Sequence, residues 1–303
     1  MAVITTGSFA KALWPGINAW YGMQYDEHRV EYTDLFKTES SDKAYEEEVA
    51  VSGFGLAPKK AEAAGISYDT ARQLFVKRYT NVTYGLGFII TREMYEDDLY
   101  SVIGKQRSRS LAFSMRQTKE TVAGNIFNRA FNSSYTGGDG LELCSTAHVT
   151  AGATFANETN PASDLSTAAL EQAAIDIMDF RDNRGLKISV QPRCLAVPTA
   201  LAFEAQRILK SALEHDTANN AINALKSMNV FPDGIKVNHY FTDANNWFII
   251  TNVPDGLKYF ERRGDDFSPG ENDFDTENAR YKATGRYVFG WTDPRAVFGS
   301  APA

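Results

Sequence analysis

Cys144 and His148 form the clearest candidate for chemistry in this 303-residue sequence. The two residues stand four positions apart, so on a helix they would share one face, where an imidazole can activate a thiol as a nucleophile. Such dyads are usually assembled from segments that are distant in the sequence, and no further nucleophile motif accompanies this one. A cysteine-dependent enzyme that uses Cys144 and His148 is therefore one hypothesis, and ordinary packing of both residues is the simpler one.

Motifs that hold metal ions or phosphates are incomplete. Asp273, Asp275 and Glu277 alternate like the start of a calcium-binding loop, but Asn278 stands where that loop needs a glycine. Gly104-Lys105 lacks the upstream glycine and the Ser or Thr of a phosphate-binding loop. The spacings typical of zinc sites are also absent from the sequence. We therefore expect no catalytic residues, no metal site and no cofactor.

Charge and cysteine content exclude several classes of protein. The chain has 31 Lys and Arg against 38 Asp and Glu, a net charge of −7 at pH 7. Tight binding along nucleic acid needs clustered cations, so we expect no protein that coats DNA or RNA. Two cysteines cannot form a disulfide framework, which favours a reducing compartment. No run approaches the roughly 20 apolar residues of a membrane helix, so we expect no contact with a membrane.

The first part of the chain predicts an arm followed by a projecting hairpin. Residues 1–43 contain scattered aromatic side chains without a sustained period, which is typical of a segment that lies on another surface. In residues 44–84, two β-rich runs flank a long polar tip. One strand face gathers Tyr45, Glu47, Val49 and Val51. Because a two-stranded hairpin is marginal alone, we expect another surface to support it.

The rest of the chain predicts a long helix and an α+β remainder. Residues 91–131 have apolar positions at steps of three and four, with acids first and bases later, which predicts one helix of about 60 Å. Further helices are predicted at 166–182 and 200–213, and strands at 186–190, 194–197, 246–251, 257–261 and 281–291. Arms and exposed strands are liabilities unless a neighbour covers them, so this organisation favours a subunit of an assembly.

Several segments resemble the major capsid proteins of tailed bacteriophages with the HK97-like fold, most closely the Mu-like major head subunit group. The segments are Tyr84–Met94, Gly138–Gly140 with Leu143–His148, Leu195–Leu201 with Ala205–Leu209, and Tyr281–Arg295. Each motif is moderately specific, and their order and spacing extend over nearly the whole chain. The resemblance implies an α+β fold divided into an N-arm (1–43), an E-loop (44–84), a peripheral domain (85–165 and 262–303, with a spine helix at 91–131) and an axial domain (166–261).

The resemblance also implies a function and partners. The chain would build an icosahedral shell from hexamers and pentamers of itself, enclosing packaged double-stranded DNA without sequence-specific binding. The shell would belong to the virion and would assemble in the cytoplasm of the bacterial host. Since the arm starts close to Met1, we expect a separate scaffolding protein, besides a portal, and the sequence leaves open whether decoration proteins bind. Some relatives cross-link an E-loop lysine to a neighbour, but no motif here supplies the partner, so we expect no cross-link.

Residues for contacts between subunits can be chosen by element. In the E-loop the candidates are Glu47, Val49, Lys59, Lys60 and Phe75. On the spine helix the candidates are Arg107, Arg109 and Arg116, paired with acids of a neighbour, although a solvated helix face explains them nearly as well. A tail-tube or other ring-forming virion protein is a further alternative, against which the long helix and the separate axial domain count.

Overall fold

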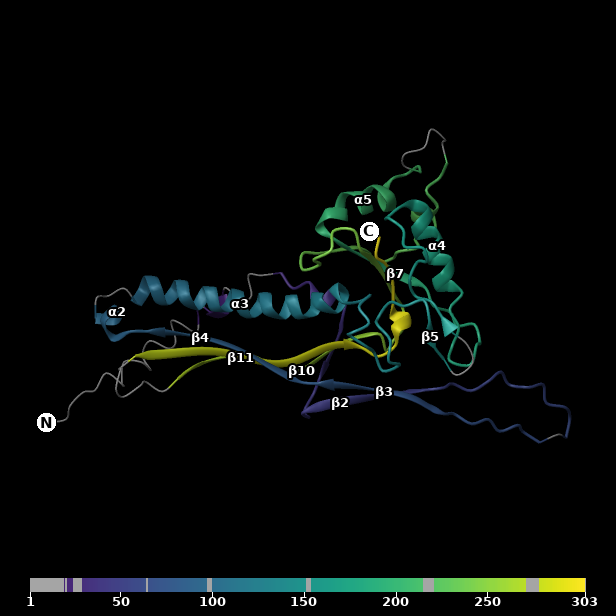
Figure 1. Cartoon of the computed structure of the whole chain (residues 1–303), viewed down its shortest axis with the longest axis horizontal. Coiled ribbons are helices and arrows are strands. Elements are labelled where there is room, and N and C mark those ends of the chain that lie inside the picture. Colours follow the sequence, from purple (N-terminus) through teal and green to yellow (C-terminus); the bar gives the residue numbers. More distant parts are fainter. Residues whose placement is uncertain are drawn as a thin grey trace.

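An elongated slab, a second body and a projecting hairpin make up the molecule (Figure 1). The structure is a computed structural model, and it describes residues 19, 21–23, 29–63, 65–96, 100–150, 154–214, 221–270 and 278–302. For residues 95, 96 and 100–103 it describes the backbone alone. The candidate calcium-binding loop at Asp273–Glu277 and the first 18 residues of the predicted arm lie outside the described residues.

The slab contains a four-stranded sheet in the order β1-β10-β11-β4. Its strands are β1 (Lys37–Ser40), β10 (Leu257–Pro269), β11 (Ala279–Trp291) and β4 (Val82–Ile90). β1 runs parallel to β10, and the other neighbours are antiparallel. The alternation predicted for residues 281–291 is confirmed, because Tyr281, Tyr287 and Phe289 are buried whereas Lys282 is exposed. One face of this sheet is therefore apolar and the other polar.

The long helix covers the apolar face of this sheet. The pattern predicted one helix over 91–131, and the structure has a short α2 (Arg92–Glu96) followed by α3 (Tyr100–Asn128). The 29 residues of α3 span about 44 Å. Gly124 of α3 allows close packing between the helix and the second body. A Cβ there would lie 2.9 Å from Cβ of Tyr240, so only glycine lets the second body approach the helix so closely.

The second body is built on a sheet in the order β12-β9-β7-β8, packed against three helices. The strands are β12 (Val297–Ser300), β9 (Trp247–Thr251), β7 (Pro192–Pro198) and β8 (Gly234–Asn238), and the helices are α4 (Thr167–Met178), α5 (Ala202–Lys210) and α6 (Ala224–Ser227). Smaller elements are the short strands β5 (His148–Val149) and β6 (Thr154–Phe155) and the 3-10 turns η1 (Tyr32–Asp34), η2 (Thr199–Leu201) and η3 (Pro294–Ala296). Ser166 begins α4 where predicted, since its Oγ accepts the N–H of Ala169 at 3.2 Å.

Two segments join a different sheet from the one that the expected domain division implied, and one predicted strand does not form. Residues 257–261 were assigned to the axial domain. They instead form the start of β10 in the long sheet, where Leu257 pairs with Trp291 at the end of β11. Residues 297–300, assigned to the peripheral domain, form β12 in the second sheet, where Phe298 is buried in its core. No strand forms at 186–190, where Lys187 makes only an isolated bridge to Arg181. Local β-rich patterns indicate strands but not the sheet that each strand joins.

The segment at residues 31–34 joins the long helix to the second body. The buried Glu120 carboxylate of α3 accepts the backbone N–H groups of Glu31 at 2.9 Å and Tyr32 at 3.0 Å. Burial raises the pKa of the Glu120 carboxyl. Asp34 forms an ion pair of 3.2 Å with Lys236, and Glu31 accepts the backbone N–H of His239 at 3.0 Å. Hydrogen bonds and an ion pair of residues 31–34 therefore connect the slab to the second body, in addition to apolar contacts.

In the described part of the chain, no helix has both the length and the apolarity that a bilayer span requires.

Candidate assembly surface

The projecting hairpin is anchored through its inner face. It consists of β2 (Tyr45–Val51) and β3 (Gln73–Thr80), and the predicted hairpin is thus present. Tyr79 is buried against Gly290, where a Cβ would lie 2.7 Å from the ring, and its hydroxyl bonds that of Thr292. The Glu48 carboxylate accepts from Thr292 and pairs with the ammonium group of Lys258. The base of the hairpin is therefore fixed to the end of the long sheet.

The outer face of the hairpin is apolar and open. Its exposed side chains are Tyr45 (43%), Val49 (48%), Val51 (54%) and Val76 (41%). The one charged pair on this face is internally neutralised, because Arg78 lies 2.6 Å from the carboxylate of Glu47. The Arg78 guanidinium also stacks 4.3 Å over the Tyr45 ring. A face with this composition gains free energy when another surface covers it.

The tip of the hairpin, residues 52–72, is extended and pairs with no strand in the described part of the chain. Its large apolar side chains are among the most exposed of the molecule, namely Phe54 (65%), Leu56 (81%), Ile66 (70%) and Tyr68 (94%). Lys59 and Lys60 are exposed at the far end. Sequence reasoning missed these four apolar residues, although their spacing of two within each arm of the tip was a usable signal.

An ion pair, together with a hydrogen bond from Arg184 to the Gly53 carbonyl at 3.4 Å, ties the tip to the second body. The Asp69 carboxylate pairs with the Arg184 guanidinium through two contacts, one of them 3.1 Å between Nη2 and Oδ1. The same carboxylate accepts the N–H of Gly55 at 2.8 Å, which joins the two arms of the tip. The hydrogen bond from Arg184 holds the pKa of the Asp69 carboxyl well below its ordinary value.

We expect Asp69→Asn to raise amide hydrogen exchange across residues 53–70 without changing the exchange of the long sheet. The charged form of Asp69 makes the contact, so the protection is complete above the ordinary carboxyl pKa and is lost only as the pH falls through the lowered value. Glu62→Gln is the matched control, since Glu62 is exposed on the same tip and forms no ion pair among the described residues. Equal exchange in the two variants would contradict this tether.

The structure places the predicted E-loop residues on different sides of the hairpin. Val49, Lys59 and Lys60 are exposed and available to a neighbour, whereas Glu47 already pairs within the hairpin. Phe75 is a correction: it is half-buried, and its ring lies against Gly138 of the same chain, where a Cβ would clash with it. Strand alternation groups Phe75 with the residues on one face of β3. It does not show that this face packs against the rest of the same subunit.

The spine-helix arginines also differ from one another. Arg107 is exposed and Arg109 is half-buried. Arg116 is a correction, because it is only 8% exposed and its charge acts on the buried Tyr21 and Glu120 of the same subunit. Its side chain is therefore not presented to a neighbour. Helical spacing orders residues around the helix, but it does not identify which face the sheet covers.

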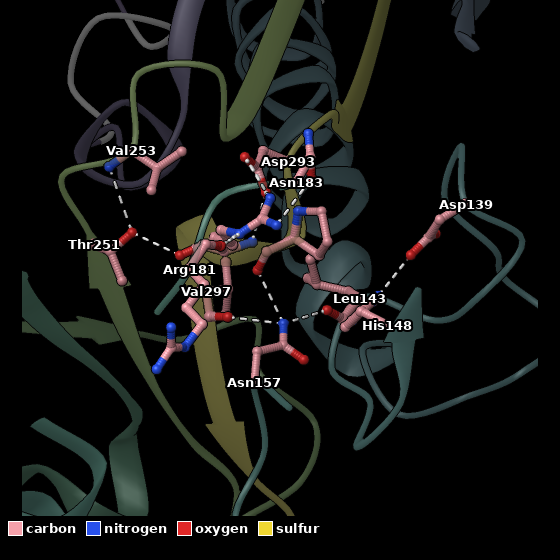
Figure 2. A network of polar contacts seen from close by, with 12 residues as sticks. Asp139, Leu143, His148, Asn157, Arg181, Asn183, Thr251, Val253, Asp293 and Val297 are labelled. Atoms are coloured by element: carbon pink, nitrogen blue, oxygen red, sulfur yellow. Dashed lines mark hydrogen bonds and ion pairs between the residues drawn. The ribbon is translucent and has the colours of Figure 1, made fainter. Parts of the chain in front are cut away.

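Cys144 and His148 are both buried rather than open to a cleft: Cys144 lies in the hydrophobic core, and His148 lies in a buried polar cluster (Figure 2). The Cys144 side chain is inaccessible, and burial raises the pKa of its thiol well above the ordinary value, opposite to what a nucleophile needs. His148 is also buried, with Nδ1 2.6 Å from Oδ2 of Asp139 and its ring stacked on Phe155. The segment is not helical. Both residues thus serve packing, and within the described residues no group of three His, Cys, Asp or Glu is placed to hold a metal ion.

Asn157 is the centre of the same cluster, where the slab meets the second body (Figure 2). Its Nδ2 group donates to the carbonyl oxygens of Leu143 at 2.7 Å, Pro294 at 2.9 Å and Val297 at 2.9 Å. Its Oδ1 accepts the N–H of Ser145 at 2.8 Å. One fully buried amide therefore satisfies backbone groups from two segments, residues 143–145 and 294–297.

A comparison with family models matches residues 75–300 to the phage capsid protein family, about three quarters of the chain. The chain belongs to the phage capsid protein family. The HK97-like fold expected from the resemblance is confirmed, and the protein is a structural protein of the virion, a major capsid protein that associates with itself to form the icosahedral shell. The search of curated protein sequences finds no match.

Solved structures show the same fold at low sequence identity. The capsid protein is similar to the virus-like particle from Pyrococcus furiosus (TM-score 0.54, 12% identity, covering 93% of this chain and 96% of the other). It is also similar to the procapsid of bacteriophage JBD30 (TM-score 0.53, 14% identity, 98% and 76%) and to Mycobacterium phage Che8 (TM-score 0.54, 13% identity, 89% and 90%). The overlap extends across slab, hairpin and second body.

Proposed function

We propose that this capsid protein forms hexamers and pentamers through its hairpin and that these close into a shell around packaged double-stranded DNA. The observation that carries the proposal is the hairpin itself, with an apolar outer face and a tip whose Leu56 and Tyr68 are 81% and 94% exposed. A monomer gains nothing from holding such residues in water, whereas a neighbouring copy would bury them. In this assignment the hairpin is the E-loop, the slab is the peripheral domain and the second body is the axial domain.

Repeated weak contacts suffice for a stable shell. Each copy offers one hairpin and one surface for the hairpin of another copy, so closure converts modest pairwise affinity into a stable container. The net charge of −7 disfavours tight adhesion of DNA, which agrees with enclosure without sequence-specific binding. A separate scaffolding protein, a portal and decoration proteins would complete the head, with assembly in the cytoplasm of the bacterial host.

Electron microscopy of the protein expressed alone and together with its scaffolding protein tests this function. We expect closed isometric shells from the wild type, and dispersed subunits from Val49→Asp/Val76→Asp, because the two carboxylates would be buried in the contact. Val149→Asp is the control, since Val149 is 64% exposed and belongs to β5 rather than to the hairpin. Dispersed wild-type subunits under both conditions would contradict the proposal, and open tubes would favour the tail-tube alternative.

A further inference from the structure

We propose that the open face of the long sheet is a docking surface for a second copy of this chain, which presents an acidic hollow of its second body. The inference rests on the proposed shell function and names two surfaces that meet in it. The basic face comprises Arg263, Lys282 and Arg286. The acidic hollow is lined by the four acids Glu158, Asp176, Asp179 and Asp182 and by one base, Arg181.

The basic face gathers three cations that form no ion pair within the described residues. Arg263 of β10 stands directly opposite Arg286 of β11, and Lys282 lies on the same face four residues earlier. The guanidinium of Arg263 donates to Oγ1 of Thr284 at 2.8 Å, which places it on the side of the sheet away from α3. Like charges directly opposite in an antiparallel pair are destabilising. None of the three cations has a carboxylate within ion-pair distance among the residues that the structure describes.

Part of the same face is open to solvent, beyond the end on which the hairpin packs. Arg263 and Lys282 are exposed, as are Gly85 and Gly87 of the neighbouring β4. A Cβ at Gly87 would lie 2.6 Å from the carbonyl oxygen of Tyr281, so β4 cannot carry a side chain at this position. β11 contributes three bases and no acid, and β10 adds one acid to this face, the exposed Asp266 opposite Thr284, so bases outnumber acids although the chain as a whole is acidic. The solvated side of this sheet is thus a positive surface in a negative protein.

The acidic hollow offers the complementary charge on the second body. It has a volume of about 410 Å³ between α4, the β5–β6 pair and the turn at residues 181–182, with Phe155 and Phe180 in its wall. Asp179 is neutralised by Lys187 at 2.6 Å, and Asp182 accepts two backbone N–H groups of its own turn. Glu158 and Asp176 have no cation partner in the described part of the chain. A basic surface of another molecule would supply one.

Both surfaces adjoin the hairpin that we assign to contacts between copies. The hairpin packs on the end of the long sheet, on the side of the basic face, through Tyr79 and Gly290. Its tip passes the hollow, since a Cβ at Gly53 would lie 4.0 Å from Oδ2 of Asp182. A copy reached by the hairpin therefore lies next to both surfaces. Because the contact joins two different surfaces, it is of the heterologous kind, which generates a ring where the rotation between copies closes.

Double-stranded DNA offers the same anionic chemistry to the basic face. A second copy is favoured because the chain itself carries a matching surface, present once for each basic face, beside the same hairpin. Complementary charge across an interface mainly sets which surfaces meet and in which register, and juxtaposed like charges reject wrong pairings. The acids of the second copy would then lower the electrostatic repulsion between Arg263 and Arg286 on assembly.

Charge reversal with rescue tests the docking of the two surfaces. Arg263→Glu/Lys282→Glu and, separately, Glu158→Lys/Asp176→Lys are expected to reduce the yield of shells about tenfold, because like charges then face each other. The variant with all four substitutions is expected to recover most of the yield, which a misfolded chain could not do. Lys210→Glu/Lys226→Glu, at two exposed lysines of the second body, is the matched control. Circular dichroism melting verifies the fold of each variant.

The possible outcomes separate this inference from the function on which it rests. Wild-type yields from both reversed pairs, or folded variants without rescue, would overturn the docking while leaving shell formation intact. Normal shells from the Arg263→Glu/Lys282→Glu variant that retain less DNA would show a polyanion surface, and the docking would be wrong. Absence of shells from the wild type would contradict the proposed function instead.

Discussion

Asp265→Asn is expected to lower the free energy of unfolding by roughly 3–5 kcal/mol, the usual cost of removing one partner of a buried ion pair. The Lys119 ammonium of α3 lies 3.2 Å from Asp265 of β10, and the two side chains are 3% and 1% exposed. The ammonium also lies 5.1 Å from the centroid of the Tyr287 ring. Without the carboxylate, a cation would remain buried between helix and sheet. Urea denaturation of the unassembled subunit measures the loss.

The matched control removes both charges. Lys119→Met/Asp265→Leu should lose less stability than Asp265→Asn, because it leaves no uncompensated charge in an apolar layer. If Asp265→Asn cost no more than the double variant, the pair would add nothing beyond its packing. The comparison also reports how firmly α3 is held against β10, since the ion pair connects these two elements directly.

Asn157→Ala is expected to destabilise the subunit by roughly 3–5 kcal/mol, because several buried backbone groups would lose their partner at once. The amide of Asn157 serves the carbonyls of Leu143, Pro294 and Val297 and the N–H of Ser145. Each unsatisfied buried group costs about 1–3 kcal/mol, with part of the sum recovered by relaxation. Thermal unfolding followed by circular dichroism measures the effect.

Asn157→Asp separates the donor from the shape of this side chain. The aspartate keeps the oxygen that accepts from Ser145 but presents a second oxygen to the three carbonyls. It should therefore be no more stable than the alanine variant at neutral pH, despite its nearly identical volume. A near-native melting temperature for Asn157→Asp would mean that packing, and not the donated hydrogen bonds, explains the role of the residue.

The assembly residues illustrate how far strand and helix periodicity extends. Alternation correctly placed Tyr45, Glu47, Val49 and Val51 on one face of β2. It did not indicate that this face is the outer one, because the inner face carries Glu48, whose charge is compensated by Lys258, 210 residues away. In the strand sequence alone, the face that carries Glu48 looks like the solvent-exposed face. Only the ion pair with Lys258 shows that it is the buried one.

The candidate chemistry failed for a related reason. The spacing of Cys144 and His148 predicted a shared helix face, but the segment is a turn whose side chains enter the core. Desolvation then raises the pKa of the thiol, an effect that depends on atoms from distant segments such as Gly299. Residue type and local spacing cannot report burial of this kind.

The order of the chain's local patterns was sufficient for the fold class, the long helix, the hairpin and the family, because each depends on periodicity or motif order within a few tens of residues. Tertiary structure alone decided that residues 297–300 join the second sheet, that Arg116 and Phe75 face their own subunit, and that Arg263 stands opposite Arg286. Tertiary contacts in this chain join segments that lie more than 200 residues apart in the sequence. Their free energies cannot be inferred from the residues of one segment.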